Sequence, residues 1–168
     1  MNRSAIEQTI RFIVLVLLQV LILNNINFLG DINPYVYVLF IALFPVINNR
    51  MTFIFLSFLI GLCIDIFSDT GGIHAAASVF VGYARPLFLK FAFGMTYEHQ
   101  TIRISQSDIG QRLIYFTLII LVHHLILFSL EIFSLSMIPS ILKLTLFSGI
   151  FSILLSILGT TLFSKRIK

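Results

Sequence analysis

The sequence contains few charged residues. Only 11% of its 168 residues are Asp, Glu, Lys or Arg, against roughly 25% in soluble domains, whereas 58% are hydrophobic. A chain of this length has too little polar surface to remain soluble in water. Uncharged runs, such as residues 12–30 and 113–130, approach the ~20 apolar residues with which a helix crosses a bilayer. We therefore expect an all-α membrane protein.

Motifs of catalysis, nucleic-acid binding and disulfide formation are also missing. Cys63 is the only cysteine, so it cannot form an internal disulfide. We find no nucleophile elbow, phosphate-binding loop or metalloprotease helix, and no RNA- or DNA-binding motif. We therefore expect a protein that is not an enzyme and uses no cofactor. Because the longest polar stretch is residues 94–112, we expect residues 1–168 to form a single polytopic membrane domain.

Turn-forming residues divide the chain into six candidate transmembrane helices, which we expect to pack as a compact bundle. Glycine, proline, aspartate and asparagine gather at residues 30–34, 48–50, 68–72 and 136–139, between the apolar runs. The second and third helices would reach only ~23 Å at 1.5 Å per residue, so they form either a tight hairpin or a re-entrant pair. The predicted helices are residues 12–29, 33–47, 51–66, 73–93, 113–135 and 141–163.

Lysine and arginine predict the orientation in the membrane. If the N-terminus is cytoplasmic, ten of the eleven basic residues fall on the cytoplasmic side and only Lys143 falls outside. This asymmetry favours two cytoplasmic termini and explains the net charge of +4 without nucleic acid. Residues 165–168 would then bind anionic lipid at the membrane surface. The ten residues are Arg3, Arg11, Arg50, Arg85, Lys90, Arg103, Arg112, Lys165, Arg166 and Lys168.

Ionisable residues near the turn between the third and fourth predicted helices form the first candidate site. Asp65 and Asp69 are four residues apart, so they share a helix face, and His74 begins the next helix. Carboxylates and imidazole are metal-ligand types, but this spacing matches no metal motif. We therefore expect a hydrogen-bonded turn that holds the two helices together. The alternative is a polar mouth that binds a lipid-linked precursor.

Arg85 is a further candidate because ionisable residues at membrane depth are usually functional. It lies 13 residues beyond Gly72, about 20 Å along a helix, which is too far for an ion pair with Asp65. Two alternatives remain open: Arg85 extends into the inner headgroups, or it binds a partner or anionic lipid. Pro86 predicts that the helix kinks or ends there.

The middle of the fifth predicted helix contains adjacent histidines, His123 and His124. Because they point about 100° apart, we expect at most one to face a given polar site, as a hydrogen-bonded core residue and not a proton relay. We expect Glu131 to be solvated. Small residues form stripes on the fourth and sixth helices, where close helix packing or a partner face is expected. These are Ala75, Ser78, Gly82, Ser148, Ser152 and Ser156.

Residues 61–86 resemble the MreD family, the rod shape-determining membrane proteins of bacteria. The length, the six spans and the basic cytoplasmic end agree along the whole chain. The resemblance implies a fold similar to that of the substrate-binding subunits of energy-coupling-factor vitamin transporters. It is carried by Gly61, Asp65, Asp69, Gly71, Gly72, His74, Ala75, Ala76, Ala77, Gly82, Tyr83, Ala84, Arg85 and Pro86.

The resemblance also implies a function. A member of this family is expected to be a non-enzymatic inner-membrane subunit of the cell-elongation machinery, which organises lateral peptidoglycan synthesis. Its expected partner is the bitopic protein MreC, beside the RodA glycosyltransferase, a class B penicillin-binding protein and MreB filaments. The similarity in fold leaves a substrate-binding subunit of a vitamin-type transporter as the alternative function.

Overall fold

The computed structural model is a bundle of helices, and it describes residues 3–28, 30, 32–46, 49–94 and 104–162. Five of the helices in this part of the chain are long and apolar enough to cross a membrane, which confirms the predicted all-α membrane bundle. The elements are α1 (Arg3–Leu21), η1 (Leu23–Asn25), α2 (Val38–Leu43), α3 (Arg50–Ser68), α4 (Ile73–Phe93), η3 (Ile104–Gln106), α5 (Ile109–Ile132), η4 (Leu135–Met137) and α6 (Ile138–Leu162).

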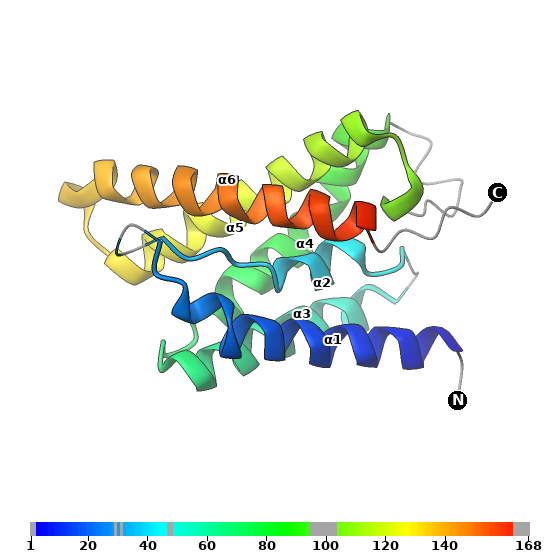
Figure 1. Ribbon diagram of the computed structural model, residues 1–168, viewed down its shortest axis with the longest axis horizontal. Helices are drawn as coiled ribbons and strands as arrows, with labels where there is room; N and C mark the ends of the chain where they lie inside the picture. Colours follow the sequence, from blue (N-terminus) through cyan, green and yellow to red (C-terminus); the bar gives the residue numbers. More distant parts are fainter. Residues whose placement is uncertain (1–2, 29, 31, 47–48, 95–103, 163–168) are drawn as a thin grey trace.

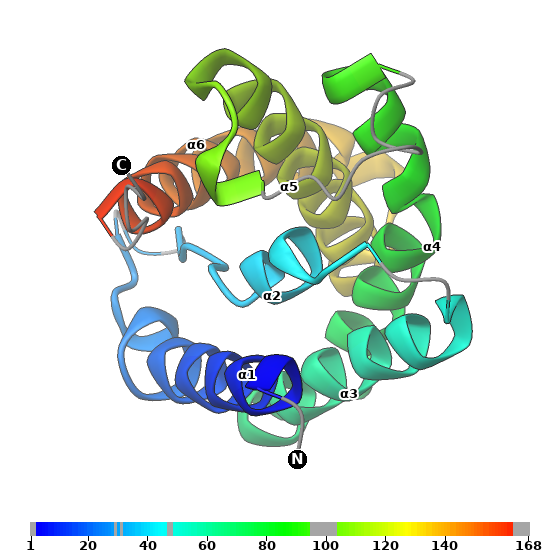
Figure 2. The same ribbon diagram turned by 90° about the vertical axis from the view of Figure 1, so that its right-hand side faces the viewer.

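The long helices surround a short one. Viewed along the bundle, α1, α3, α4, α5 and α6 lie around α2 (Figure 2). Figure 1 shows that α1 begins and α6 ends at the same end of the bundle, which we call the terminal end. The opposite end, where α3 turns into α4 and α5 into α6, is called the distal end. Residues 32–46, here called the central segment, run from the distal end to the terminal end (Figure 1).

The prediction of a helix over residues 33–47 is wrong. Only Val38–Leu43 is helical, and Ile47 lies outside the described residues. The helix stops because Phe44 is extended, with ψ 139°, as expected for a residue that precedes a proline. The re-entrant alternative fails as well, because α3 has 19 residues and the central segment crosses between the two ends of the bundle (Figure 1).

Other helix boundaries differ less. The helix α1 begins at Arg3, well before residue 12, and ends at Leu21. The Asn25 side chain donates hydrogen bonds of 3.3 Å to the carbonyls of Val20 and Leu21, which pairs the last carbonyls of the helix. Pro86 does not end α4, which continues to Phe93.

The helices α3 and α4 are in close contact. A Cβ atom on Gly61 would lie 2.5 Å from the Cα of Ala75, and one on Gly82 would lie 2.8 Å from the Oγ of Ser57. No larger side chain fits at Gly61, because the neighbouring atoms belong to the backbone of α4. These two small residues therefore set the distance between the helices at two levels.

The core of the bundle is built around the central segment. The side chains of Tyr37, Phe40 and Ile41 are buried and pack against residues of the surrounding helices, among them Ile60 and Ile119. The outer surface carries many exposed apolar side chains, as expected for a surface in contact with lipid. The bundle therefore has an aromatic and aliphatic interior as well as an apolar exterior.

Candidate functional site: a polar network around the central segment

The central segment creates a problem of hydrogen bonding at membrane depth. Outside Val38–Leu43 its backbone is not helical, so its N–H and C=O groups need other partners. Water is absent from the hydrocarbon core, and irregular backbone is tolerated there only where the protein pairs it. Four surrounding helices supply polar side chains for this purpose.

Gln19 of α1 pairs the beginning of the segment. Its side chain is 0% exposed. The Oε1 atom accepts a 2.8 Å hydrogen bond from the N–H of Val36, and Nε2 donates to the carbonyl of Pro34 at 3.0 Å and to Oδ1 of Asn24 at 2.8 Å. One amide side chain therefore pairs both a donor and an acceptor of the segment.

Ser152 of α6 pairs the backbone of Tyr35, which lies between the two segment residues that Gln19 binds. Its Oγ accepts a hydrogen bond from the N–H of Tyr35 at 2.8 Å and lies 3.2 Å from Nε2 of His124. The Nδ1 atom of His124 lies 2.7 Å from the carbonyl of Ile120, so Nδ1 carries the proton and Nε2 accepts from the serine hydroxyl. Ser152 thus links α5, α6 and the central segment.

Arg85 of α4 pairs the other end of the segment. Its Nη2 donates to the carbonyl of Ala42 at 3.1 Å and to that of Phe44, the acceptors left over where α2 ends. Its Nε donates to the hydroxyl of Tyr115 at 3.0 Å, and Tyr115 donates to the Ala42 carbonyl at 3.0 Å. The guanidinium carbon lies 4.9 Å from the ring centroid of Phe53.

Both predicted roles of Arg85 are wrong. The side chain is 3% exposed, so it neither extends into the headgroups nor faces a partner or a lipid. Its charge is stabilised by carbonyl dipoles and by the face of an aromatic ring, which is a common solution for a cation at membrane depth. Arg85 therefore acts as a cap for α2.

Tyr37 lies at the centre of the network. Its hydroxyl is 2.9 Å from Nδ1 of His74 and 2.8 Å from Nε2 of His123. The hydroxyl has one proton to donate, so one of the two imidazoles must donate to it. The Nδ1 atom of His123 is buried without a partner among the described residues.

These contacts fix the direction of the hydrogen bonds. A buried acceptor without a partner is less unfavourable than a buried N–H without one, so His123 carries its proton on Nε2 and donates to Tyr37. Tyr37 then donates to Nδ1 of His74. Both His123 and His124 are buried, but they bind different partners: His123 contacts the Tyr37 hydroxyl, whereas His124 contacts Ser152 and the Ile120 carbonyl. Only His123 faces Tyr37, as expected for adjacent helix positions that point about 100° apart.

Asp65 joins the two helices of the distal turn. Its two oxygens accept hydrogen bonds from the N–H groups of His74 at 3.0 Å and Ala75 at 2.8 Å, and the hydroxyl of Thr70 donates to it at 2.6 Å. The carboxylate therefore pairs free N–H groups in the first turn of α4, where the helix dipole also favours a negative charge. The turn between α3 and α4 is held by this side chain.

The side chains of Asp69 and His74 take no part in the hydrogen bonds of that carboxylate. Asp69 is exposed and ends α3 in a left-handed conformation, with φ 54°. The imidazole of His74 points to Tyr37, although its backbone N–H binds Asp65. The four predicted residues Asp65, Asp69, His74 and Arg85 therefore do not form one cluster, and in the described residues no group of three or more possible metal ligands occurs.

The predicted small-residue stripes face the interior. All six residues are buried, so they pack between the helices of this chain and do not form an exposed partner face. Ser148, one turn before Ser152, has a buried hydroxyl with no partner in the described part of the chain. The stripe residues are Ala75, Ser78, Gly82, Ser148, Ser152 and Ser156.

Three residues of the network did not enter the sequence-based prediction. Gln19 is a polar residue within an uncharged apolar run, and such a residue signals an interior contact in a membrane helix. Tyr37 and Tyr115 give no comparable signal, because tyrosine also occurs in apolar cores with its hydroxyl paired.

This network connects the helices of the bundle. Its hydrogen bonds join α1, α4, α5 and α6 to the central segment, and they define a multi-pass α-helical membrane protein whose interior contains a broken crossing segment. In comparisons with known proteins, the chain matches no family model, no curated protein and no solved structure.

Proposed function

We propose that this protein is a non-enzymatic scaffold subunit of the bacterial cell-elongation machinery, similar to MreD, which binds a bitopic MreC-like protein in the inner membrane. The proposal is supported by the resemblance over residues 61–86. Several of those residues have a structural role in the bundle. Gly61 and Gly82 allow close packing of α3 against α4, Asp65 caps α4, and Arg85 caps α2.

The single observation that carries the proposal is that the interior of the bundle is filled by the chain itself. Tyr37, Ile41 and Tyr115 occupy the centre and are completely buried. The polar side chains around them bind backbone groups of the central segment. A rigid bundle of this kind suits a protein that works through its outer surface, whereas a vitamin-binding subunit needs an interior space for its ligand.

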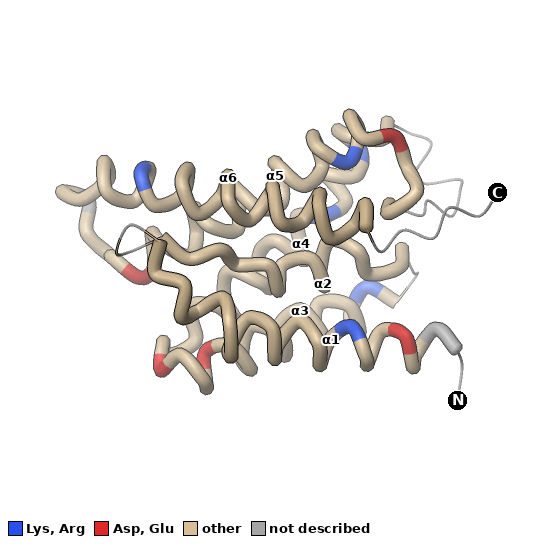
Figure 3. The backbone as a smooth tube through the Cα atoms, viewed as in Figure 1, with Lys and Arg blue, Asp and Glu red and all other residues tan. Residues whose placement is uncertain are grey.

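The distribution of charge supports two cytoplasmic termini. Lysine and arginine gather toward the terminal end in Figure 3. Among the described side chains, the half of the bundle toward the terminal end contains Arg11, Arg50, Lys90 and Arg112 with Glu7 and Asp108, whereas the distal half contains Lys143 with Asp65, Asp69 and Glu131. Basic residues favour the cytoplasmic side. Arg103, Lys165, Arg166 and Lys168 lie outside the described residues.

Cysteine labelling tests this orientation. In a Cys63→Ala background, we expect a cysteine at Gln106 to react in intact cells only with a membrane-permeant maleimide, and one at Thr70 to react also with an impermeant maleimide. Gln106 is in η3 near the terminal end and Thr70 is in the distal turn. Labelling of Gln106 by the impermeant reagent in intact cells would contradict the proposed orientation.

Depletion and co-purification test the function itself. Loss of the protein from a rod-shaped bacterium is expected to produce round cells that still form septa. The purified protein is expected to retain an MreC-like partner and to bind no vitamin at micromolar concentration. Tight vitamin binding, together with normal cell shape after depletion, would reject the scaffold proposal in favour of the transporter alternative.

Substitutions inside the bundle cannot map the partner surface. Gly82→Leu and Ser152→Leu place bulky side chains in the buried interior, so they are expected to reduce the amount of folded protein. Outward-facing substitutions such as Leu17→Trp and Leu154→Trp, at exposed positions, leave the interior unchanged. A partner-binding defect at normal protein abundance should therefore come only from outward-facing positions.

A further inference from the structure

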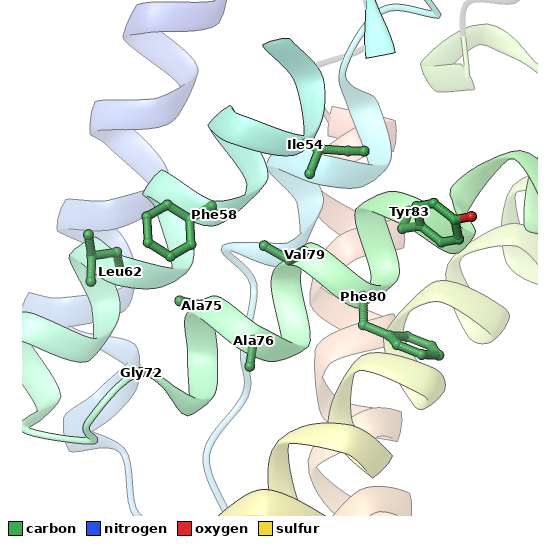
Figure 4. Close-up of a pocket in the computed structure, with 9 residues that line it drawn as sticks. All are labelled: Ile54, Phe58, Leu62, Gly72, Ala75, Ala76, Val79, Phe80 and Tyr83. Carbon is green, nitrogen blue, oxygen red and sulfur yellow. The ribbon is translucent and has the colours of Figure 1, made fainter. Parts of the chain in front are cut away.

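The outer face of the α3–α4 pair contains an apolar groove with a volume of about 600 Å³. Figure 4 shows its walls: Ile54, Phe58 and Leu62 extend from α3, and Ala76 and Tyr83 lie on α4. The α4 wall has only small residues in its distal half. Large side chains therefore line that half from α3 alone, and the space on the α4 side stays open. It opens toward the lipid, since Phe58 and Tyr83 are exposed.

A cation marks one end of the groove. Arg50, Ile54, Phe58 and Leu62 follow one another at intervals of four residues and so form one ridge of α3. The guanidinium carbon of Arg50 lies 4.4 Å from the ring centroid of Tyr83, and its Nη2 donates to the Tyr83 carbonyl at 3.0 Å. Both residues are at the terminal end of the groove.

The charge of Arg50 is available to an anion. The side chain is exposed, and among the described residues it contacts the ring and carbonyl of Tyr83 and no carboxylate. Arg50 is also the first residue of α3, where the helix dipole is positive. Lys90, exposed on α4 seven residues after Tyr83, adds a second cation on the same helix face.

The length of the groove fits one leaflet of a bilayer. From Arg50 to Leu62 the helix rises about 18 Å at 1.5 Å per residue, close to half of the ~30 Å hydrocarbon core. A partner helix would cover the full thickness of the membrane and would gain nothing from a cation at one end. A molecule with an anionic head and an apolar tail one leaflet long matches both features.

We propose that the α3–α4 groove binds an anionic phospholipid, with one acyl chain between Ile54, Phe58 and Ala76 and the phosphate group against Arg50. The site goes beyond the proposed function, because it depends only on the outer face of the bundle. It predicts separate contributions from the head and the tail of the lipid.

Lipid binding to the purified full-length protein can separate the two contributions. Native mass spectrometry would measure the affinities for phosphatidylglycerol and for phosphatidylcholine with the same acyl chains. Arg50→Gln should weaken phosphatidylglycerol binding about fivefold, the effect of about 1 kcal/mol per basic residue near an anionic lipid, and should weaken phosphatidylcholine binding less, because the choline group of that lipid offsets its phosphate charge. Ala76→Leu fills the groove and should weaken the binding of both lipids equally.

Two variants serve as controls. Lys143→Gln removes an exposed cation at the distal end and should change neither affinity, whereas Arg50→Lys should keep the preference for phosphatidylglycerol. The proposal is overturned if Arg50→Gln leaves the preference intact, if Lys143→Gln lowers it equally, or if Ala76→Leu has no effect. Thermal unfolding of each variant shows whether it is folded, and a folded Arg50→Lys protein without the preference also overturns the proposal.

Photo-crosslinking identifies the occupant in cells. A photoreactive amino acid at Phe80, an exposed residue that lines the groove, should yield an adduct with the mass of one phospholipid. A product of twice the protein's mass would indicate a second copy of the chain, and a larger heterologous product would indicate a partner helix. Either of these protein adducts, in place of the lipid adduct, overturns the proposal.

Discussion

The α3–α4 pair and the central segment are stabilised in different ways. The pair is held by contacts between residues close in sequence: Asp65 reaches N–H groups nine and ten residues ahead. The central segment depends on distant side chains. Gln19 binds a residue 17 positions away, Arg85 one 43 positions away, and Ser152 one 117 positions away.

This difference separates two uses of polar residues in a membrane protein. In the helix pair, a carboxylate pairs the first turn of a regular helix, whose remaining backbone groups pair internally. Around the central segment, side chains replace the hydrogen bonds that a continuous helix would have made. The central segment therefore requires the other helices to be in place, whereas the α3–α4 hairpin contains its own cap.

Gly61→Leu should have the largest effect, because it breaks the helix pair directly. A side chain at this position meets the backbone of α4 at 2.5 Å, and a backbone contact cannot be relieved by a side-chain rotation. We expect almost no folded protein in the membrane, as measured by detergent extraction and size-exclusion chromatography. Gly159→Ala is the control, because a Cβ there meets no atom within 4 Å; equal yields of the two variants would refute the close contact.

Arg85→Met should have the next largest effect on stability, because it removes hydrogen bonds to the central segment. The substitution leaves the carbonyl of Phe44 without its donor and removes one donor each from the Ala42 carbonyl and the Tyr115 hydroxyl. We expect a loss of about 3 kcal/mol of stability, from unpaired buried groups at ~1 to 3 kcal/mol each, measured by thermal unfolding in detergent. Lys90→Met, exposed on the same helix, should unfold like the wild type. A stable Arg85→Met protein would show that α2 needs no cap.

The sequence was sufficient to predict the regular parts of this fold. The helix α4 was predicted with the bounds observed, Ile73–Phe93, because Gly71 and Gly72 begin it and Gly94 follows it. The apolar runs also predicted α3, α5 and α6 to within a few residues. Such signals are local, since they depend on turn residues and hydrophobic length alone.

The central segment shows where this reasoning fails. Residues 33–47 are apolar enough to suggest a crossing helix, but the helix within them has only six residues, and its C-cap Phe44 precedes Pro45. The groups that pair the remaining backbone come from four other helices, so their roles depend on tertiary contacts that spacing does not encode. Arg85 illustrates this point. The sequence indicates that a charged side chain at membrane depth is energetically unfavourable, but the partners of Arg85, the carbonyls of Ala42 and Phe44, are visible only in three dimensions.

Asp65→Ala tests the cap of the helix pair. It leaves the N–H groups of His74 and Ala75 without their acceptor, at a cost of ~1 to 3 kcal/mol, and should reduce the amount of folded protein more than Glu131→Ala does. Asp69→Ala is a closer control, because Asp69 is in the same turn but exposed. If the three variants accumulate and unfold alike, the carboxylate is not structural; loss of function at normal abundance would indicate a ligand mouth.

Tyr37→Phe should have the smallest effect, although it removes the hydroxyl between His74 and His123 at the centre of the network. The substitution leaves one buried donor, the Nε2–H of His123, without its acceptor, against two N–H groups for Asp65→Ala. We therefore expect a cost of about 1 kcal/mol, the low end of the ~1 to 3 kcal/mol range, and the phenyl ring keeps its packing. The measurement is thermal unfolding beside Tyr83→Phe, whose hydroxyl belongs to an exposed residue. A destabilisation as large as that of Arg85→Met would mean that the histidine network, and not the cap of α2, holds the central segment in place. An unchanged unfolding temperature would instead mean that backbone pairing by Gln19, Ser152 and Arg85 is sufficient.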